Sequence, residues 1–357
     1  MGAGVASGYR ALACCAAAAV VRGTAMEKRI FGRTGLELSV LGLGCGAVGG
    51  LMVRGDPLDQ ERTIARAIDA GVNYFDTALQ YGNGESEKNL GRILQKLKPA
   101  DAVVGTKVRL TSAEFDHIAD AVATSLEGSL ARLRRDRVDI FHLHNAITEA
   151  GGGETLSVQQ VLDEVVPAFE RLRRQGKTRF LGLTAIGDTA ALYQVIDAGA
   201  FNSAQVVYNM LNPSAGTELP PNYPAQDYGR LFDHTRKAGV GVIGIRVLAG
   251  GALSGSTERH PIASPPPEPI GSAISYEADV TRAFRLMPIV QEGFAASLTE
   301  AATRFVISHR AIGTVLVGIA TQHQFENALA AVEKGPLPPA ALKRLSAVLQ
   351  TFSGEPR

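Results

Sequence analysis

The sequence predicts an α/β protein in which one (β/α)8 (TIM) barrel carries an N-terminal β-hairpin and extra C-terminal helices. After Met26, short apolar runs alternate with amphipathic stretches, the pattern of parallel βαβ units. Eight such strand–helix repeats can be counted. Eight repeats close more naturally into a barrel than into an open doubly wound sheet, so a closed barrel is favoured over an open dinucleotide-binding sheet.

The hairpin is expected from Lys28 to Ser39, turning at Arg33-Thr34-Gly35. The barrel strands are expected at Leu41–Gly44, Asn73–Asp76, Val103–Lys107, Val138–His142, Phe180–Thr184, Ala204–Tyr208, Val240–Ile245 and Thr314–Val317.

The helices between the strands are predicted from apolar residues that recur every three to four positions. They are expected at 58–70, 86–98, 115–134, 158–175, 189–198, 226–238, 297–309 and 322–332. Two further helices, Tyr276–Glu292 and Pro339–Phe352, are extra to the repeat. Segments 146–157 and 250–276 are rich in Gly, Ser or Pro and are expected to be loops beside the active face.

Bulk composition excludes several classes of function. The chain has 36 Lys plus Arg against 35 Asp plus Glu, so no broad electrostatic field favours nucleic acid or an anionic membrane. Cys14, Cys15 and Cys45 offer neither a CxxC pair nor a set spaced for disulfides or zinc. We therefore expect no metal and a reducing, cytoplasmic location.

Residues 1–25 form a separate leader, and residues 26–357 are expected to form one barrel domain. The leader contains Arg10 and Arg22, no acidic residue, and the apolar run Ala11–Val21. That run is too short to span a bilayer, which takes about 20 apolar residues. The leader is either a disordered or misassigned start or a targeting signal, and its composition fits both.

Four ionisable residues are expected at the carboxyl ends of barrel strands or in the loops that follow, where (β/α)8 enzymes place their active sites. These residues are Asp76, Tyr81, Lys107 and His144. Each has a structural explanation when taken singly, because an Asp can cap a helix, a Tyr can pack and a Lys can extend to solvent.

Together the four residues fit the requirements of carbonyl reduction. Hydride delivery to a carbonyl needs a proton donor at the oxygen, and a Tyr can be that donor. Its ordinary pKa is about 10, so a neighbouring cation such as Lys107 is expected to help it exchange a proton. Asp76 would keep a buried Lys107 charged. His144 could hold the substrate oxygen or relay the proton.

Several stretches resemble the aldo-keto reductase superfamily, from Lys28 to about Ala331. They are "FGRTGLELSVLGLGCGAVGG", "GVNYFDTALQYGNGESEKNLGRIL", "VVGTKV" and "SLARLRRDRVDIFHLHN". The resemblance implies a (β/α)8 barrel, NADPH or NADH bound across its C-terminal face, and reversible carbonyl reduction. It also implies that the four residues above are a catalytic tetrad. His142 is a second candidate for the histidine and is expected to pack or line the barrel.

The resemblance also implies a set of cofactor-binding residues. They are Gly44, Cys45, Gly46, Asp76, Thr184, Gln205, Arg246, Leu248, Gly318, Gln324 and Asn327. Three departures affect the cofactor. Ala185 replaces an asparagine, "IRVL" at 245–248 replaces an aromatic-Ser-Pro-Leu segment, and Gln324 stands where NADP-preferring members often have a basic residue. NADP is the default, and NAD stays open.

The leading interpretation is an NAD(P)H-dependent enzyme that reduces a small aldehyde or ketone, with Tyr81 as general acid and base. Two alternatives remain open. One is an NAD-dependent sugar or alcohol dehydrogenase running the reverse reaction, and the other is a non-catalytic cofactor-binding regulatory subunit.

Overall fold

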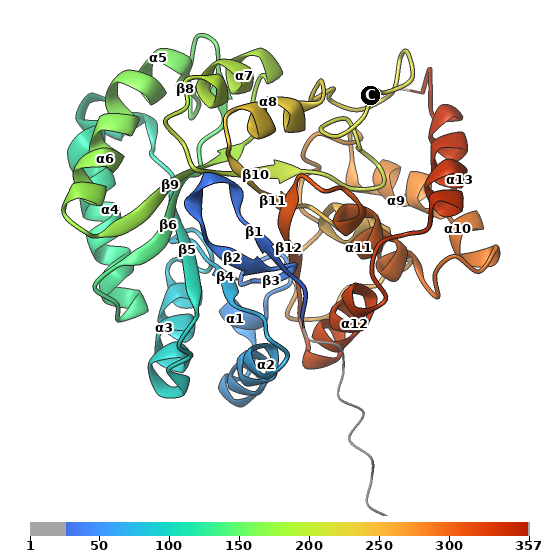
Figure 1. Cartoon of the computed structure of the whole chain (residues 1–357), viewed down its shortest axis with the longest axis horizontal. Coiled ribbons are helices and arrows are strands. Elements are labelled where there is room, and N and C mark those ends of the chain that lie inside the picture. The colour runs from blue at the N-terminus through green and yellow to red at the C-terminus, as the bar shows by residue number, and fades with distance from the viewer. Residues whose placement is uncertain (1–25, 356–357) are drawn as a thin grey trace, which may run out of the picture.

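The computed structural model of the chain describes residues 26–355. The leader predicted for residues 1–25 lies outside these described residues. The centre of the fold is a closed barrel of eight strands, each hydrogen-bonded in parallel to its two neighbours (Figure 1). In barrel order the strands are β3 (Leu41–Gly44), β4 (Tyr74–Asp76), β5 (Val103–Val108), β6 (Val138–Leu143), β9 (Thr178–Ala185), β10 (Ser203–Val207), β11 (Gly241–Ile245) and β12 (Ile312–Gly318). All eight predicted strands are confirmed, and their order in the barrel follows their order in the sequence.

The N-terminal hairpin closes the end of the barrel at which the strands begin. Strands β1 (Lys28–Ile30) and β2 (Glu37–Ser39) pair antiparallel around a 3-10 turn, η1 (Gly32–Thr34). Phe31 is fully buried, and a Cβ on either Gly241 or Gly313 would lie 2.7 Å from its ring. These glycines belong to the first residues of β11 and β12, so their missing side chains make room for the hairpin (Figure 1).

The helices surround the barrel, and each apolar face packs on the strands. After β3 come α1 (Leu51–Arg54) and α2 (Pro57–Asp69), then α3 (Glu85–Leu97), η2 (Ser112–His117) with α4 (Ile118–Leu133), α5 (Val158–Gln160), α6 (Val166–Arg174), α7 (Thr189–Asp197), α8 (Leu231–Lys237), α11 (Leu298–Ser308) and α12 (Gln322–Glu333). Additional elements are η4 (Ala249–Ser254), α9 (Tyr276–Phe284), α10 (Pro288–Gln291) and α13 (Pro339–Gln350). Within residues 26–355, no helix has the length and apolar character needed to cross a membrane.

Three predicted helices differ from the observed ones in where they begin or in their continuity. The helix expected at 226–238 begins only at Leu231, because Gly229 and Arg230 have φ of 53° and 60°, outside the helical region. The helix expected from Tyr276 to Glu292 is broken into α9 and α10 before Pro288, which has no N–H to donate. The helix expected at 158–175 contains a π-helical turn, η3 (Val161–Val165), just before Pro167.

The two predicted loops have structure that the sequence does not indicate. In the Gly-rich segment 146–157, β7 (Ile147–Thr148) pairs in parallel with β8 (Leu156–Ser157). The long loop after β11 reaches the segment that follows β3, where Arg54 Nε donates to the Ile262 carbonyl at 2.7 Å and Ser264 N donates to the Val48 carbonyl at 3.2 Å. This loop therefore crosses the rim of the barrel near the end of β12.

Candidate active site

Three of the four predicted catalytic residues meet at the carboxyl end of two neighbouring strands. Asp76 is the last residue of β4, Lys107 is the last but one of β5, and Tyr81 lies in the turn that follows β4. That turn is held to the barrel because Ser86, at the start of α3, donates to the Cys45 carbonyl at 2.8 Å. The short β4–α3 connection thus directs Tyr81 back over the barrel.

The Lys107 ammonium is fully buried and all three of its hydrogens have acceptors. It forms an ion pair with Asp76 Oδ1, donates to the Thr77 carbonyl at 2.8 Å, and donates to the Tyr81 hydroxyl oxygen at 3.2 Å. An ammonium has no lone pair, so the phenol oxygen must be the acceptor. The hydroxyl hydrogen of Tyr81 is consequently free to point at a substrate.

The Asp76 carboxylate is held from both sides. While Lys107 bonds Oδ1, Oδ2 accepts from Gln205 Nε2 at 2.6 Å and from the Tyr74 hydroxyl at 3.1 Å. Gln205 belongs to β10, four strands away from β4 in the barrel, so its side chain reaches across the barrel interior. One of the two N–H groups of Gln205, a residue of the expected cofactor-binding set, is therefore used on Asp76.

Tyr74 is a further residue of the candidate site that the sequence alone did not indicate. It stands two positions before Asp76 on the same strand, so both side chains point to the same face. Its pKa lies well above the ordinary value, chiefly because the phenol is buried and also because it faces the Asp76 charge. Tyr74 therefore stays protonated and acts as a donor that steadies the carboxylate. The alternation in "YFD" could have revealed it.

The charges of the site follow from burial and pairing. Burial acts to lower the pKa of Lys107, but Asp76 and Tyr81 together outweigh it, so that pKa lies above its ordinary value. Burial raises the pKa of Tyr81 by more than Lys107 lowers it. Lys107 thus acts in the expected direction without making the phenol acidic overall. At neutral pH the site therefore holds the Lys107 ammonium, paired with Asp76, and a protonated Tyr81 phenol.

The structure places the two histidines in different surroundings. The His144 ring follows β6 and faces Tyr81 edge-on, with 6.1 Å between ring centroids. Burial, aided by the Lys107 charge, lowers the pKa of His144 to about 3, and its Nδ1 has no hydrogen-bond partner in the part of the chain that the structure describes. His142 instead lies within β6 and reaches over Gly182 to the Ser203 hydroxyl at 3.1 Å. His142 thus packs inside the barrel, and His144 is the histidine that accompanies Tyr81.

Several predicted cofactor residues line the same rim of the barrel. Gly318, Gly44 and Asp76 stand in register on three adjacent strands. Cys45 is buried, which raises its pKa, and its N–H donates to the Asp76 carbonyl at 2.9 Å. A Cβ on Gly46 would lie 3.7 Å from the Tyr81 ring, so this glycine leaves one side of the ring open.

Two polar side chains stand next to each other on β9 and β10. Thr184 and Gln205 are in register, and the buried Thr184 hydroxyl has no hydrogen-bond partner among residues 26–355. A buried hydroxyl without a partner is costly, so this group calls for a partner that the described chain does not provide. The donor and acceptor set at this position fits a carboxamide such as that of nicotinamide.

The remaining predicted cofactor residues lie farther along the rim, at the ends of β11 and β12. Half-buried Arg246 and Leu248 follow β11, and Arg246 has a φ of 56° and donates to the Glu268 carbonyl at 3.2 Å. On α12, the Gln324 side chain accepts from the Ala320 N–H at 2.7 Å, and Asn327 pairs with His323. The structure does not bring Gln324 and Asn327 to the Asp76–Lys107 pair.

Comparison with known proteins agrees with this geometry. A model of the Aldo/keto reductase family matches residues 40–350. This chain belongs to the aldo/keto reductase family. L-galactose dehydrogenase of Arabidopsis thaliana is 31% identical over 317 residues, covering 87% of this chain and 89% of that protein. The family and its named relatives make this chain an oxidoreductase.

Two further aldo/keto reductase relatives have other named activities. Pyridoxal 4-dehydrogenase of Microbacterium luteolum is 26% identical over 84% of this chain and 91% of its own length. Aflatoxin B1 aldehyde reductase member 2 of Rattus norvegicus is 28% identical over 84% of this chain and 83% of its own length. An aldo-keto reductase of Bacillus halodurans, solved in its holo form, superposes with a TM-score of 0.65 at 24% identity over 92% of this chain and 98% of that one. This likeness shows the shared barrel fold.

Proposed function

We propose that this aldo/keto reductase transfers hydride between a nicotinamide dinucleotide and a small carbonyl compound, with Tyr81 as the proton donor in reduction. The observation that carries the proposal is the Lys107–Tyr81 hydrogen bond of 3.2 Å beside the Asp76 ion pair. This arrangement fixes the phenol and leaves its hydrogen available. The proposed substrate is a small aldehyde or ketone.

The residues at the rim support a nicotinamide cofactor. Thr184 and Gln205 would hold the carboxamide, and the unpartnered Thr184 hydroxyl is the feature that such a group would satisfy. A dinucleotide could lie along the rim formed by the backbone of Gly44, Cys45 and Gly46 on one side and Gly318 on the other. When bound, the cofactor supplies the hydride that is added to the carbonyl carbon. We propose NADP as this cofactor, with NAD as the alternative.

The chain's own residues would donate the proton and stabilise the charge that its loss creates. In reduction, the Tyr81 O–H donates its proton to the carbonyl oxygen, which becomes the alcohol hydroxyl. The Lys107 ammonium then stabilises the phenolate that remains, and Asp76 keeps Lys107 charged. His144 is neutral near physiological pH because burial lowers its pKa to about 3, so one ring N–H can hydrogen-bond the substrate oxygen.

The direction of the reaction depends on the protonation of Tyr81. Burial, which outweighs Lys107, raises the pKa of Tyr81 above its ordinary value of 10.0. The phenol therefore carries its proton at neutral pH, which suits reduction. Oxidation of an alcohol needs the phenolate to accept a proton and is expected to accelerate as the pH rises.

A second candidate function is supported by the relatives' names. L-galactose dehydrogenase covers most of this chain, and D-threo-aldose 1-dehydrogenase of a Pseudomonas species is 29% identical over 52% of this chain. Both names describe sugar oxidation. The same four residues would serve this reaction in reverse, with Tyr81 as the base. The names of the relatives favour an enzyme over the regulatory-subunit alternative.

The test is to follow NADPH and NADH oxidation with a panel of aldehydes and ketones at pH 7. Aldose oxidation with NAD and NADP at pH 9 is measured in parallel. We expect turnover that Tyr81→Phe lowers by about 10²- to 10⁴-fold, the usual contribution of a positioned acid. Cofactor affinity, measured by fluorescence titration, should stay within about twofold. Turnover retained by Tyr81→Phe would remove Tyr81 from the mechanism, and faster aldose oxidation would favour the second candidate.

A further inference from the structure

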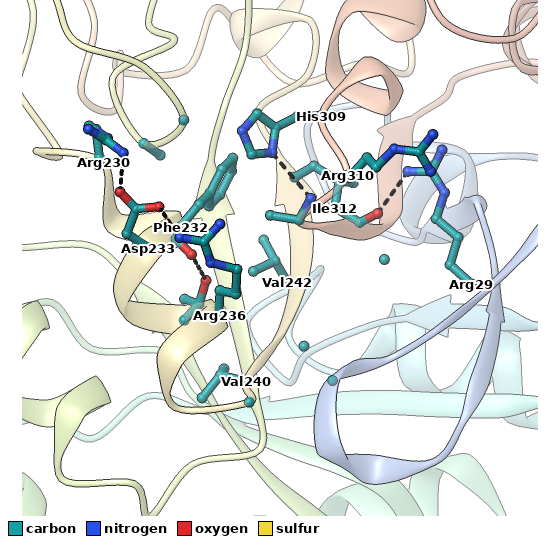
Figure 2. Close-up of a pocket in the computed structure, with 18 of the residues that line it drawn as sticks. Arg29, Arg230, Phe232, Asp233, Arg236, Val240, Val242, His309, Arg310 and Ile312 are labelled. Atoms are coloured by element: carbon teal, nitrogen blue, oxygen red, sulfur yellow. Dashed lines mark hydrogen bonds and ion pairs between the residues drawn. The ribbon is translucent and has the colours of Figure 1, made fainter.

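A pocket of about 370 Å³, drawn in Figure 2, lies at the end of the barrel where β11 and β12 begin, opposite the end that carries Tyr81 and Lys107. It is lined by the first residues of β11 and β12, by α8, by β1 of the hairpin and by the turn at Ala215–Gly216. Parallel strands place their carboxyl ends, and hence the Asp76–Lys107 site, at the other rim. The pocket is therefore separate from the proposed active site, and its volume is in the range of small-molecule sites.

The floor of this pocket is hydrocarbon and its two sides are cationic. The apolar lining consists of Ile30, Ala215, Phe232, Val240, Val242, Ala311 and Ile312. In Figure 2, Arg230 and Arg236 stand on one side and Arg29 and Arg310 on the other, with Val242 between them. Among residues 26–355, the one carboxylate that lines the pocket with these four arginines is Asp233.

Pairing leaves one of these guanidiniums free. Asp233 holds Arg230 at 2.6 Å and Arg236 at 3.0 Å, while Arg29 pairs with Glu27 and donates to the Ile312 carbonyl at 2.9 Å. Across residues 26–355, the Arg310 guanidinium has neither an ion pair nor a hydrogen bond. His309 adds no charge near neutral pH, because burial lowers its pKa. The pocket thus carries a net positive charge with one cation available for a ligand.

Many backbone groups in this pocket are already used within the chain. The lining N–H groups that donate to other groups of the chain include those of Gly216, Gly239, Val240, Gly241, Ala311 and Ile312. A bare phosphate or sulfate needs several donors to replace its hydration, and this floor offers none of these six. A guanidinium at the rim above hydrocarbon instead suits an anionic head on an apolar body.

The rim carries a second sign of an apolar ligand. Ile30 is 72% exposed, and it is one of four large apolar side chains within residues 26–355 that are exposed in this way. It stands on β1 at the edge of the pocket. An apolar ligand body that extends to this edge would cover part of the exposed Ile30 side chain.

We propose that this pocket binds a small organic carboxylate, with its carboxylate against Arg310 and its hydrocarbon or aromatic body between Ile30 and Val242. The proposal stands independently of the proposed catalytic function, since no lining residue belongs to the tetrad or to the cofactor set.

The first experiment titrates the full chain with benzoate by isothermal calorimetry at fixed ionic strength. Benzyl alcohol is the neutral probe of the same size and inorganic phosphate is the bare anion. We expect saturable benzoate binding, with benzyl alcohol and phosphate each at least tenfold weaker. Phosphate binding that equals benzoate binding would overturn the proposal, because the apolar floor would then contribute nothing.

Two charge variants locate the binding. Arg310→Glu should weaken benzoate binding at least tenfold, and Ile30→Glu should weaken it several-fold. The matched controls are Arg174→Glu, at an exposed arginine of α6 that is also unpaired in the described residues, and Leu58→Glu, at the 62% exposed Leu58 of α2. Benzoate bound at the active face would bind wild type and Arg310→Glu equally, and that result would overturn the proposal. So would a dimer, detected by analytical ultracentrifugation, that Arg310→Glu dissociates, because the face would then be a subunit interface.

Discussion

The hydroxyl of Tyr74 occupies the space that a side chain on Gly105 would need. A Cβ on Gly105 would lie 2.5 Å from the Tyr74 oxygen and 3.4 Å from Asp76 Oδ2. The two residues stand on neighbouring strands, where Gly105 pairs in register with Asp76. Gly105, the glycine of "VVGTKV" two residues before Lys107, thus leaves room for the Tyr74 hydroxyl, which donates to the Asp76 carboxylate.

The first prediction concerns this Tyr74–Gly105 contact. Gly105→Ala should destabilise the protein by about 1–3 kcal/mol, because an added methyl overpacks the barrel interior. In a Tyr74→Phe background, where the clashing oxygen is absent, the same change should cost at least 0.5 kcal/mol less, a coupling typical of residues in contact. Urea unfolding of the four proteins measures the cycle. Strictly additive costs would show that the hydroxyl is not what excludes a side chain at Gly105.

The second prediction concerns the buried Lys107–Asp76 ion pair. Asp76→Asn should cost about 3–5 kcal/mol, because it leaves a buried ammonium without its counter-charge. The control is Asp101→Asn, which breaks the exposed pair with Lys28 at 2.8 Å and should cost less than about 1 kcal/mol. Both are measured by urea unfolding at pH 7. Equal costs would contradict the assignment of Lys107 as a charged residue in the folded chain.

Most of the barrel could be predicted from the sequence because its signals are local. Each strand is a short apolar run, and glycines such as Gly71, Gly176, Gly199 and Gly239 mark the ends of helices with left-handed φ. The helix expected at 226–238 was placed too early, because its start is fixed by tertiary bonds. Tyr228 N donates to the Ser214 hydroxyl at 2.9 Å and Arg230 N donates to the Ser214 carbonyl at 2.8 Å. No local pattern in the sequence reports those partners.

Part of the candidate site could likewise be predicted from the sequence, and part of it could not. The barrel prediction already places Asp76 and Lys107 on neighbouring strands and Tyr81 in the turn after the first of them. The sequence could therefore predict that these three residues lie close together. The bond from Gln205 to Asp76 crosses the barrel and depends on which side chains point inward at the same height, which register alone decides. The raised pKa of Tyr81 was not expected either, since the effect of burial on the phenol needs coordinates.

The third prediction concerns the effect of acid on His144. Burial, with Lys107, lowers its pKa from 6.5 to about 3 in the folded chain. Between these two pH values, His144 therefore binds a proton in the unfolded chain but not in the folded chain. The stability that comes from keeping His144 neutral is complete above pH 6.5 and is lost as the pH falls from 6.5 toward 3.

Urea unfolding of wild type and His144→Gln at pH 7 and pH 4.5 tests this sign. We expect the variant to lose less stability between the two pH values, by about 1–3 kcal/mol, since each pKa unit corresponds to 1.36 kcal/mol. His234→Gln is the control, because His234 is partly exposed and forms its 2.9 Å contact with Asp197 on the outer helices. Identical acid losses in wild type and His144→Gln would mean that His144 is hydrated in the folded chain.

The fourth prediction concerns cofactor preference at the start of α12. Gln324 is uncharged and exposed, and its side-chain oxygen accepts from the Ala320 N–H in the turn after β12. A guanidinium here would face the 2′-phosphate of NADP if the adenine end of the dinucleotide lies on α12, and charge-assisted bonds to phosphate are strong. Gln324→Arg should therefore raise the affinity for NADPH relative to NADH by about tenfold, or 1.4 kcal/mol. Fluorescence titration with both cofactors measures the ratio, and Gln350→Arg, at an exposed position of α13, controls for the added charge. A ratio that shifts equally in both variants would mean that the 2′-phosphate does not contact α12.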